Sequence, residues 1–256
     1  MNRWVKISYL SAVFLFLYFP IITIVIYSFN DSSISSQWQG FTWHWYRSLI
    51  NNHHLIKLTF HSFLLGISAA SIATVLGSMA AICLYRYRFY GKQLLHLLIF
   101  MLVISPEIVI AISLLLFFSW LKIPLGFISL LLAHTVFCMP YVTITVYSRL
   151  LTIDKNLLKA AKELGANEFR IFYQILLPLI RVSILGGWLI SFALSLDDVI
   201  ISFFLSGPEF SILPLEIYSW VRLGIKPELN ALCSILLGLT LISVLFFQLL
   251  LKPRDE

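Results

Sequence analysis

Six long apolar runs, each long enough to cross a lipid bilayer, most constrain what this chain can fold into. A membrane-spanning helix needs roughly 20 mostly apolar residues, because the hydrocarbon core is about 30 Å thick. The runs cover residues 8–29, 60–85, 94–120, 127–148, 180–204 and 230–251. Inside lipid every backbone N–H needs a hydrogen-bond partner within the protein, so a span must be a helix or part of a β-barrel. These runs are not the short alternating segments of a β-barrel. We therefore predict an all-α membrane protein with six transmembrane helices, formed as one domain over residues 1–256.

The distribution of basic residues predicts the orientation of these helices. With both termini in the cytoplasm, 13 of the 18 Lys and Arg residues lie on the cytoplasmic side and 5 on the opposite side. Membrane proteins concentrate basic residues in their cytoplasmic loops, so both termini are expected there. The net charge of +6 then reflects topology, and no basic patch of the kind that binds nucleic acid is evident.

No motif for catalysis or metal binding accompanies the apolar runs. The chain has no P-loop, H-E-x-x-H or G-x-S-x-G pattern. Cys83, Cys138 and Cys233 are far apart within spans, where they are expected to be packing residues. His134 stands alone in the fourth span, which is typical of a hydrogen-bonded interior residue. We expect a protein that is not an enzyme and that binds no metal or cofactor itself.

Residues 152–180 form a charged segment between two spans and must lie in water. Leu157, Leu158, Ala161 and Leu164 recur at helical spacing, and Gly165 can adopt the positive φ that ends a helix. Asn167 can cap a second helix, which is expected to run to Pro178 at the entry to the next span. A short amphipathic helix held between two spans suggests a docking element for a soluble partner.

The same segment resembles the cytoplasmic coupling loop of permease subunits of bacterial ABC importers. That family's pattern is Glu-Ala-Ala, three residues, Gly, nine residues, then Ile-x-Leu-Pro. Here Lys159 replaces the leading Glu, while six residues are in register, namely Ala160, Ala161, Gly165, Ile175, Leu177 and Pro178. The resemblance implies a type I ABC importer permease fold in which residues 152–178 contact an ATP-binding subunit, with Ala160, Ala161, Gly165, Leu177 and Pro178 as coupling residues.

Three carboxylates within the predicted spans require a functional explanation, because a charge inside a membrane costs a few kcal/mol or more. Glu107 lies roughly 20 Å along the third span, directly after the helix-disrupting Pro106. Asp197 and Asp198 lie roughly 25 Å along the fifth span. No Lys or Arg lies within a turn of either aspartate. An unneutralised acidic lining favours cations and repels anions, so we predict a cation path past Glu107, Asp197 and Asp198.

A polar stripe on the fifth span distinguishes the two aspartates. Its members recur at steps of three or four and are Ser183, Gly187, Ser191, Ser195, Asp198, Ser202 and Ser206. The small residues alone favour close helix packing. A carboxylate on the same face favours a water-lined path, so Asp198, Ser195 and Ser202 are predicted to line it. Asp197 is turned about 100° away and is expected to be structural. By contrast, Gly66, Ala70, Ala73, Gly77 and Ala81 form an uncharged stripe that predicts helix packing alone.

The segment 205–229, between the last two spans, is predicted to face the outer side of the membrane. Aromatic rings at the water boundary usually anchor a protein at the membrane interface. Pro208 and Pro214 interrupt the segment, which could instead form a re-entrant or interfacial helix. Its acidic and aromatic residues could meet a cationic solute or its delivery protein at an outer mouth, and are Glu209, Glu216, Tyr218 and Trp220.

Several further segments resemble the permeases of spermidine/putrescine ABC importers, including SPEIVIAISLLL at 105–116, SFALSLDDVIISFF at 191–204 and GPEFSILPLEIYS at 207–219. This resemblance implies a polyamine importer of the bacterial inner membrane. It also implies a second, homologous permease, two ATP-binding subunits that hold ATP and Mg, and a periplasmic polyamine-binding protein. The acidic span residues independently suit an alkyl-ammonium substrate.

Two other functions remain open from the sequence. A related ABC permease could carry another cation or a small organic solute. A proton-coupled secondary transporter could use Asp198 and Glu107 as relay sites, although the coupling loop argues against this.

Overall fold

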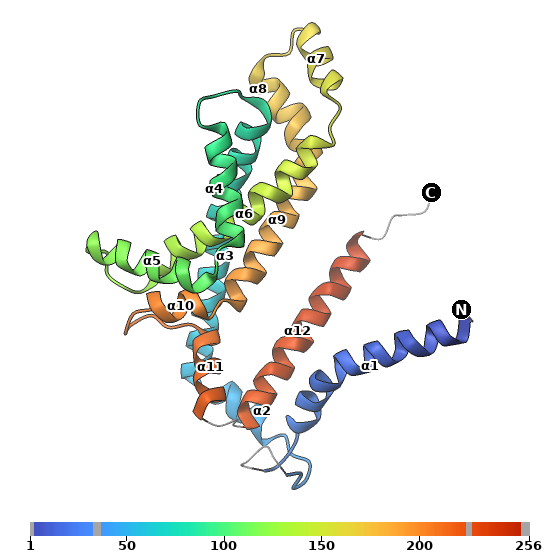
Figure 1. Cartoon of the computed structure of the whole chain (residues 1–256). Helices are drawn as coiled ribbons and strands as arrows, with labels where there is room; N and C mark the ends of the chain where they lie inside the picture. The colour runs from blue at the N-terminus through green and yellow to red at the C-terminus, as the bar shows by residue number, and fades with distance from the viewer. Residues whose placement is uncertain (1–2, 33–36, 224–226, 252–256) are drawn as a thin grey trace. The chain divides into compact units, whose positions relative to one another are not determined.

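The computed structural model describes residues 3–32, 37–223 and 227–251, and these residues are almost entirely helical (Figure 1). Along the chain the helices are α1 (Arg3–Tyr27), α2 (His44–Asn51), α3 (His53–Arg86), α4 (Lys92–Ile104), α5 (Glu107–Trp120), α6 (Phe127–Leu151), α7 (Lys155–Glu163), α8 (Glu168–Arg170), the π-helix η1 (Ile171–Leu176), α9 (Leu177–Asp197), α10 (Ile200–Leu205), α11 (Leu213–Leu223) and α12 (Pro227–Leu251). The described residues contain one isolated β-bridge, between Asn30 and Phe41, and no strand. The predicted all-α class is confirmed.

Four helical stretches among the described residues are long and apolar enough to cross a membrane. They are Ile7–Tyr27, His53–Arg86, Phe127–Leu151 and Glu168–Asp197, and a fifth results if α4 and α5 count as one span. The last predicted span forms α12, but many of its side chains lie outside the described residues. The protein is therefore a multi-pass membrane protein.

The predicted third span, 94–120, is divided into α4 and α5, which meet at an angle of 113°. The break falls at Ser105 and Pro106, whose backbone ψ angles are 137° and 134°. Proline cannot donate the helical hydrogen bond and forces the residue before it out of the helical region, which explains the position of the bend. Glu107 becomes the first residue of α5 as a result.

Residues 58–215 form one compact unit, in which α6 packs along α9 and the glycines of α3 lie against both helices. At Gly77 of α3, an added Cβ would lie 2.8 Å from the Cβ of Val142 in α6. At Gly187 of α9, an added Cβ would lie 3.2 Å from a methyl carbon of the same valine. Small residues allow helix backbones to approach this closely inside a membrane. All members of the α3 stripe are buried, so its predicted packing role is confirmed.

The predicted fifth span, 180–204, begins earlier and ends sooner than expected. The helices α8, η1 and α9 run on without a break, so the expectation that Pro178 separates a second loop helix from the span is wrong. The π-helix directly before Pro178 is a geometry that can accommodate a missing N–H donor. At the other end α9 stops at Asp197, and the chain continues into α10, which packs against α5 and α6.

The second unit comprises residues 1–57 and 216–256, in which α12 packs against α1 and α2. Its connecting segment is held by Asn30, whose side chain bonds the backbone of Gln37 and Gln39. The backbone oxygen of Asn30 accepts a bond from the indole of Trp45. In the same unit, the Ser48 hydroxyl donates to Glu228 at the start of α12, at 2.7 Å. The apolar side chains of α1 are exposed within the chain, as expected of a helix that faces lipid or another subunit.

Candidate functional site

The break between α9 and α10 is built around the carboxylate of Asp198, which is 6% exposed. One carboxylate oxygen, Oδ1, accepts a bond from the backbone N–H of Ile201 at 3.2 Å. The other, Oδ2, accepts bonds from the backbone N–H and the hydroxyl of Ser202, both at 2.8 Å. The carboxylate therefore caps the first turn of α10 and supplies acceptors that this helix start would otherwise lack.

His134 of α6 lies against this cap and is fully buried. Its Nδ1 atom is 2.7 Å from the hydroxyl of Ser195, and its Nε2 atom is 3.0 Å from the hydroxyl of Ser202. Nε2 also lies 3.6 Å from Oδ2 of Asp198. The predicted interior, hydrogen-bonded histidine is confirmed.

The predicted faces of the two aspartates are reversed in the structure. Asp198 is buried, whereas Asp197 is exposed at the end of α9. The prediction treated residues 180–204 as one continuous helix, but Asp198 has an extended backbone with ψ of 124°, so helical angles do not apply beyond it. In this structure Asp198 therefore lies inside the protein and not on an open face.

The polar stripe of the fifth span is a packing face. Within it Gly187, Ser191, Ser195, Asp198 and Ser202 are all buried, and α9 packs along α6. The simpler interpretation, a small-residue face for helix contact, is the one that the structure supports. Ser195 and Ser202 are occupied by their bonds to His134. In this structure their hydroxyls face His134 and not an open surface.

Glu107 is exposed at the start of α5. The helix α5 packs against α10, which follows Asp197 and Asp198 in the chain. Among the described residues, no salt bridge joins Glu107 or Asp197 to a Lys or Arg side chain. Two exposed, unneutralised carboxylates at adjoining helix breaks provide a site that attracts cations.

The four residues predicted for an outer mouth are divided between the two units. Glu209 is exposed beside a cavity of about 680 Å³, between residues 124–128 and 208–210 of the larger unit. In the smaller unit, Glu216 lies 3.8 Å from the ring of His54, and the Arg222 guanidinium stacks on Tyr218. The fourth residue, Trp220, is buried. Segment 205–229 contains the helix α11, in agreement with the predicted helix there.

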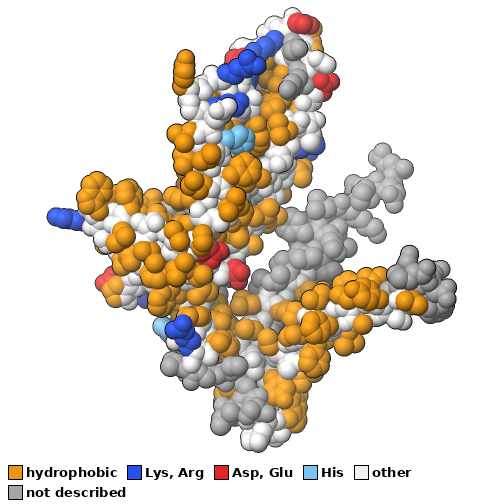
Figure 2. Space-filling view, viewed as in Figure 1, with side chains coloured by type: hydrophobic (Ala, Val, Ile, Leu, Met, Phe, Trp, Pro, Cys, Tyr) orange, Lys and Arg blue, Asp and Glu red, His pale blue; other side chains and the backbone are white. Residues whose placement is uncertain are grey.

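The predicted coupling loop contains the expected first helix, α7, and α8 begins after it and runs on into α9. Asp154 caps α7, and Gly165 follows this helix with φ of +79°. Asn167 caps α8 with a 2.8 Å bond from the backbone N–H of Arg170. Glu168 bonds Lys162 of α7 at 2.9 Å and also pairs with Arg86 at the end of α3. The loop is thereby joined to α3, and Figure 2 shows Lys and Arg side chains gathered at this end of the larger unit.

The predicted coupling residues differ in their exposure to solvent. Ala161 is only 8% exposed and packs into the core beneath the loop, so its side chain is not part of the outer surface. Ala160 and Pro178 are exposed, and Leu177 is half-buried. The side chain of Lys159 lies outside the described residues. Leu164 and Phe169 are not among the predicted coupling residues, although they are 87% and 70% exposed; two large apolar side chains in a charged loop were the available signal.

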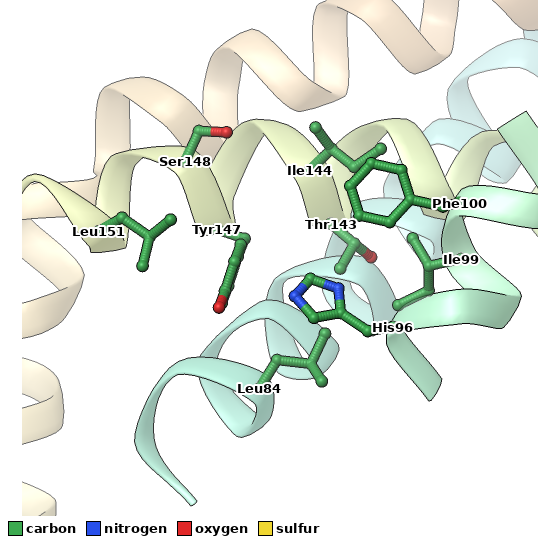
Figure 3. A pocket seen from close by; sticks show the side chains of 9 residues that line it. All are labelled: Leu84, His96, Ile99, Phe100, Thr143, Ile144, Tyr147, Ser148 and Leu151. Carbon is green, nitrogen blue, oxygen red and sulfur yellow. The ribbon is translucent and has the colours of Figure 1, made fainter. Parts of the chain in front are cut away.

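A separate cavity of about 280 Å³ lies between the ends of α3, α4 and α6. Figure 3 shows the His96 ring near the centre of this cavity and close to Phe100. The His96 and Tyr147 rings meet edge to face, with their centroids 5.0 Å apart. The Nδ1 atom of His96 is buried and has no hydrogen-bond partner among the described residues. The lining is mostly apolar and contains no Asp, Glu, Lys or Arg, so this cavity does not suit a cationic solute.

Comparison with known proteins defines the class of protein to which this fold belongs. Residues 73–254 match the family described as binding-protein-dependent transport system inner membrane component. The chain belongs to this family, which confirms the predicted resemblance to importer permeases.

Individual proteins with similar sequences are more specific than the family description. The chain is 46% identical over 255 residues to the spermidine/putrescine transport system permease protein PotC of Escherichia coli K12, covering 100% of this chain and 97% of that protein. It is 47% identical over 249 residues to PotC of Haemophilus influenzae, covering 97% of each chain. It is also 38% identical over 240 residues to the putrescine transport system permease protein PotI of E. coli K12, covering 91% of this chain and 85% of PotI.

Two solved structures share the fold at low sequence identity. A bacterial ABC transporter involved in the import of alginate matches with a TM-score of 0.75 and 14% identity, over 100% of this chain and 99% of that chain. The MetNI methionine ABC transporter matches with a TM-score of 0.65 and 16% identity, over 75% of this chain and 91% of that chain. These similarities support an importer permease fold. The relatives are permease subunits rather than enzymes.

Proposed function

We propose that this chain is a permease subunit of an ATP-driven importer of spermidine and putrescine in a bacterial inner membrane. The observation that carries the proposal is the full-length similarity to PotC, together with two exposed carboxylates that no basic residue neutralises in the described structure. A polyamine presents ammonium groups along an apolar chain, and carboxylates at the surface of membrane helices offer it electrostatic attraction. Glu107 and Asp197 are the proposed contacts, and Asp198 with Ser195 and Ser202 forms the support behind them.

The proposed topology has six spans with both termini in the cytoplasm, in a single transmembrane domain. The excess of basic residues in the loops assigned to the cytoplasm supports this orientation. The coupling loop at 152–178 would then meet an ATP-binding subunit through exposed residues such as Ala160, Leu164 and Phe169. Glu209 would lie on the opposite side of the membrane, where a solute-binding protein delivers its cargo.

The proposed assembly contains a second, homologous permease, two ATP-binding subunits and a periplasmic polyamine-binding protein. ATP and Mg would be bound by the ATP-binding subunits. Exposed apolar side chains along α1, together with the exposed acids of the larger unit, are surfaces that lipid or a second permease could cover.

Reconstitution tests this function directly. The chain is co-expressed with its partner subunits, purified, and placed in proteoliposomes with the binding protein outside and ATP inside. We expect spermidine or putrescine to stimulate ATP hydrolysis and to accumulate in the lumen. Competition by other cations and by small neutral solutes measures specificity. Uptake that collapses with the proton gradient but persists without ATP would instead support the secondary-transporter alternative.

A further inference from the structure

The hydrogen bonds around His134 form a buried chain that joins α6, α9 and α10. The Ser202 hydroxyl donates to Oδ2 of Asp198, so its oxygen must accept the bond from Nε2 of His134. Nε2 therefore carries a proton, and in a neutral imidazole Nδ1 accepts the bond from the Ser195 hydroxyl. A neutral imidazole satisfies each member of the chain, and each side chain is at most 6% exposed.

This chain of bonds determines where the last residue of α9 points. Asp198 caps α10 from an extended backbone, so the direction of the chain after Asp197 is fixed by the bonds that hold the cap. The helix α10 then packs on α5, which begins with Glu107. The relative position of Asp197 and Glu107 thus depends on a buried network that touches neither of them.

We propose that His134 is a positioning residue for import: through Ser202 and Asp198 it holds the α9–α10 break in the geometry that sets the position of Asp197 relative to Glu107. The inference rests on the proposed function, because it gives Asp197 and Glu107 the role of receiving a cationic substrate. A buried polar network is a costly way to join helices, since well-packed apolar side chains stabilise them at least as well. Hydrogen bonds are directional, so this network holds the backbone of the α9–α10 break in a single geometry.

The first test needs no knowledge of the substrate. In the assembled complex with Cys83, Cys138 and Cys233 replaced by alanine or serine, Asp197→Cys is labelled with a water-soluble, charged methanethiosulfonate reagent. Adding His134→Leu should change the labelling rate about tenfold, because two buried hydrogen bonds to the break are lost. His134→Gln keeps one donor and one acceptor and should stay within about twofold.

The matched control is Thr135→Val on the same helix. Thr135 is 7% exposed, but its hydroxyl bonds only the carbonyl of Leu131 in its own helix, so its loss should leave the labelling rate unchanged. If the His134→Leu complex does not assemble, Ser202→Ala removes the hydroxyl between His134 and Asp198 and is expected to change the rate in the same way. A rate unaffected by the variant that assembles would overturn the inference, whether or not polyamines are transported.

The second test connects the network to transport. His134→Leu should raise the KM for spermidine uptake about tenfold and leave ATP hydrolysis without substrate unchanged. Combined with Asp197→Asn, it should add little to the loss caused by Asp197→Asn alone, because both changes remove the same interaction. Losses that multiply would assign His134 a merely structural role. Absence of polyamine uptake by the unaltered complex would refute the proposed function, while the labelling result would still decide the role of His134.

Discussion

Replacing the buried Asp198 by asparagine should lower the stability of the protein, and any effect on substrate recognition should follow from that loss. Asp198 accepts three hydrogen bonds, two from backbone N–H groups and one from a hydroxyl. Asparagine has only one acceptor oxygen, so its amide nitrogen must face the N–H of either Ile201 or Ser202. One buried N–H then loses its acceptor, at a cost of about 1–3 kcal/mol. Since a domain is typically stable by only about 5–15 kcal/mol, Asp198→Asn should lower both the yield and the melting temperature of the complex.

The neighbouring Asp197→Asn is the control for charge. Asp197 is exposed, so its exchange should leave the melting temperature unchanged while raising the KM for spermidine roughly tenfold through lost attraction. Thermal unfolding of the detergent-purified complex and uptake per assembled complex in proteoliposomes measure the two effects separately. The reasoning fails if Asp198→Asn melts like the unaltered protein yet does not transport, while Asp197→Asn transports normally.

Three further changes test the packing and the coupling loop. Gly77→Leu should prevent assembly, because even a Cβ there would lie 2.8 Å from Val142 Cβ and 2.9 Å from a backbone oxygen; normal yield would contradict this. Gly165→Val should reduce uptake in a well-expressed complex, since a β-branched residue resists φ of +79°, and full uptake would exclude a conformational role. Leu164→Asp should weaken co-purification of the ATP-binding subunit several-fold at unchanged permease stability, because Leu164 is 87% exposed; the exposed Glu163→Gln serves as its control.

Much of the helical organisation follows from local properties of the sequence. Apolar length placed four of the candidate spans, and Pro106 marked the bend in the third. The coupling loop was predictable because its signals are local: Asp154 and Asn167 cap helices, and Gly165 supplies the positive φ. The small-residue stripe on α3 was also predictable, since glycine and alanine at steps of three and four residues favour close packing.

Composition and local patterns are enough to predict an all-helical membrane protein with a charged loop between two spans and three acids inside its apolar runs. Which of these acids is exposed depends on tertiary contacts. Asp197 and Asp198 have identical side chains, and a continuous helix would turn them about 100° apart. The helix ends between them because Asp198 can cap α10 and bond through Ser202 to His134, which lies more than 60 residues away in the chain. That choice depends on a contact between distant residues, and helical periodicity contains no information about it.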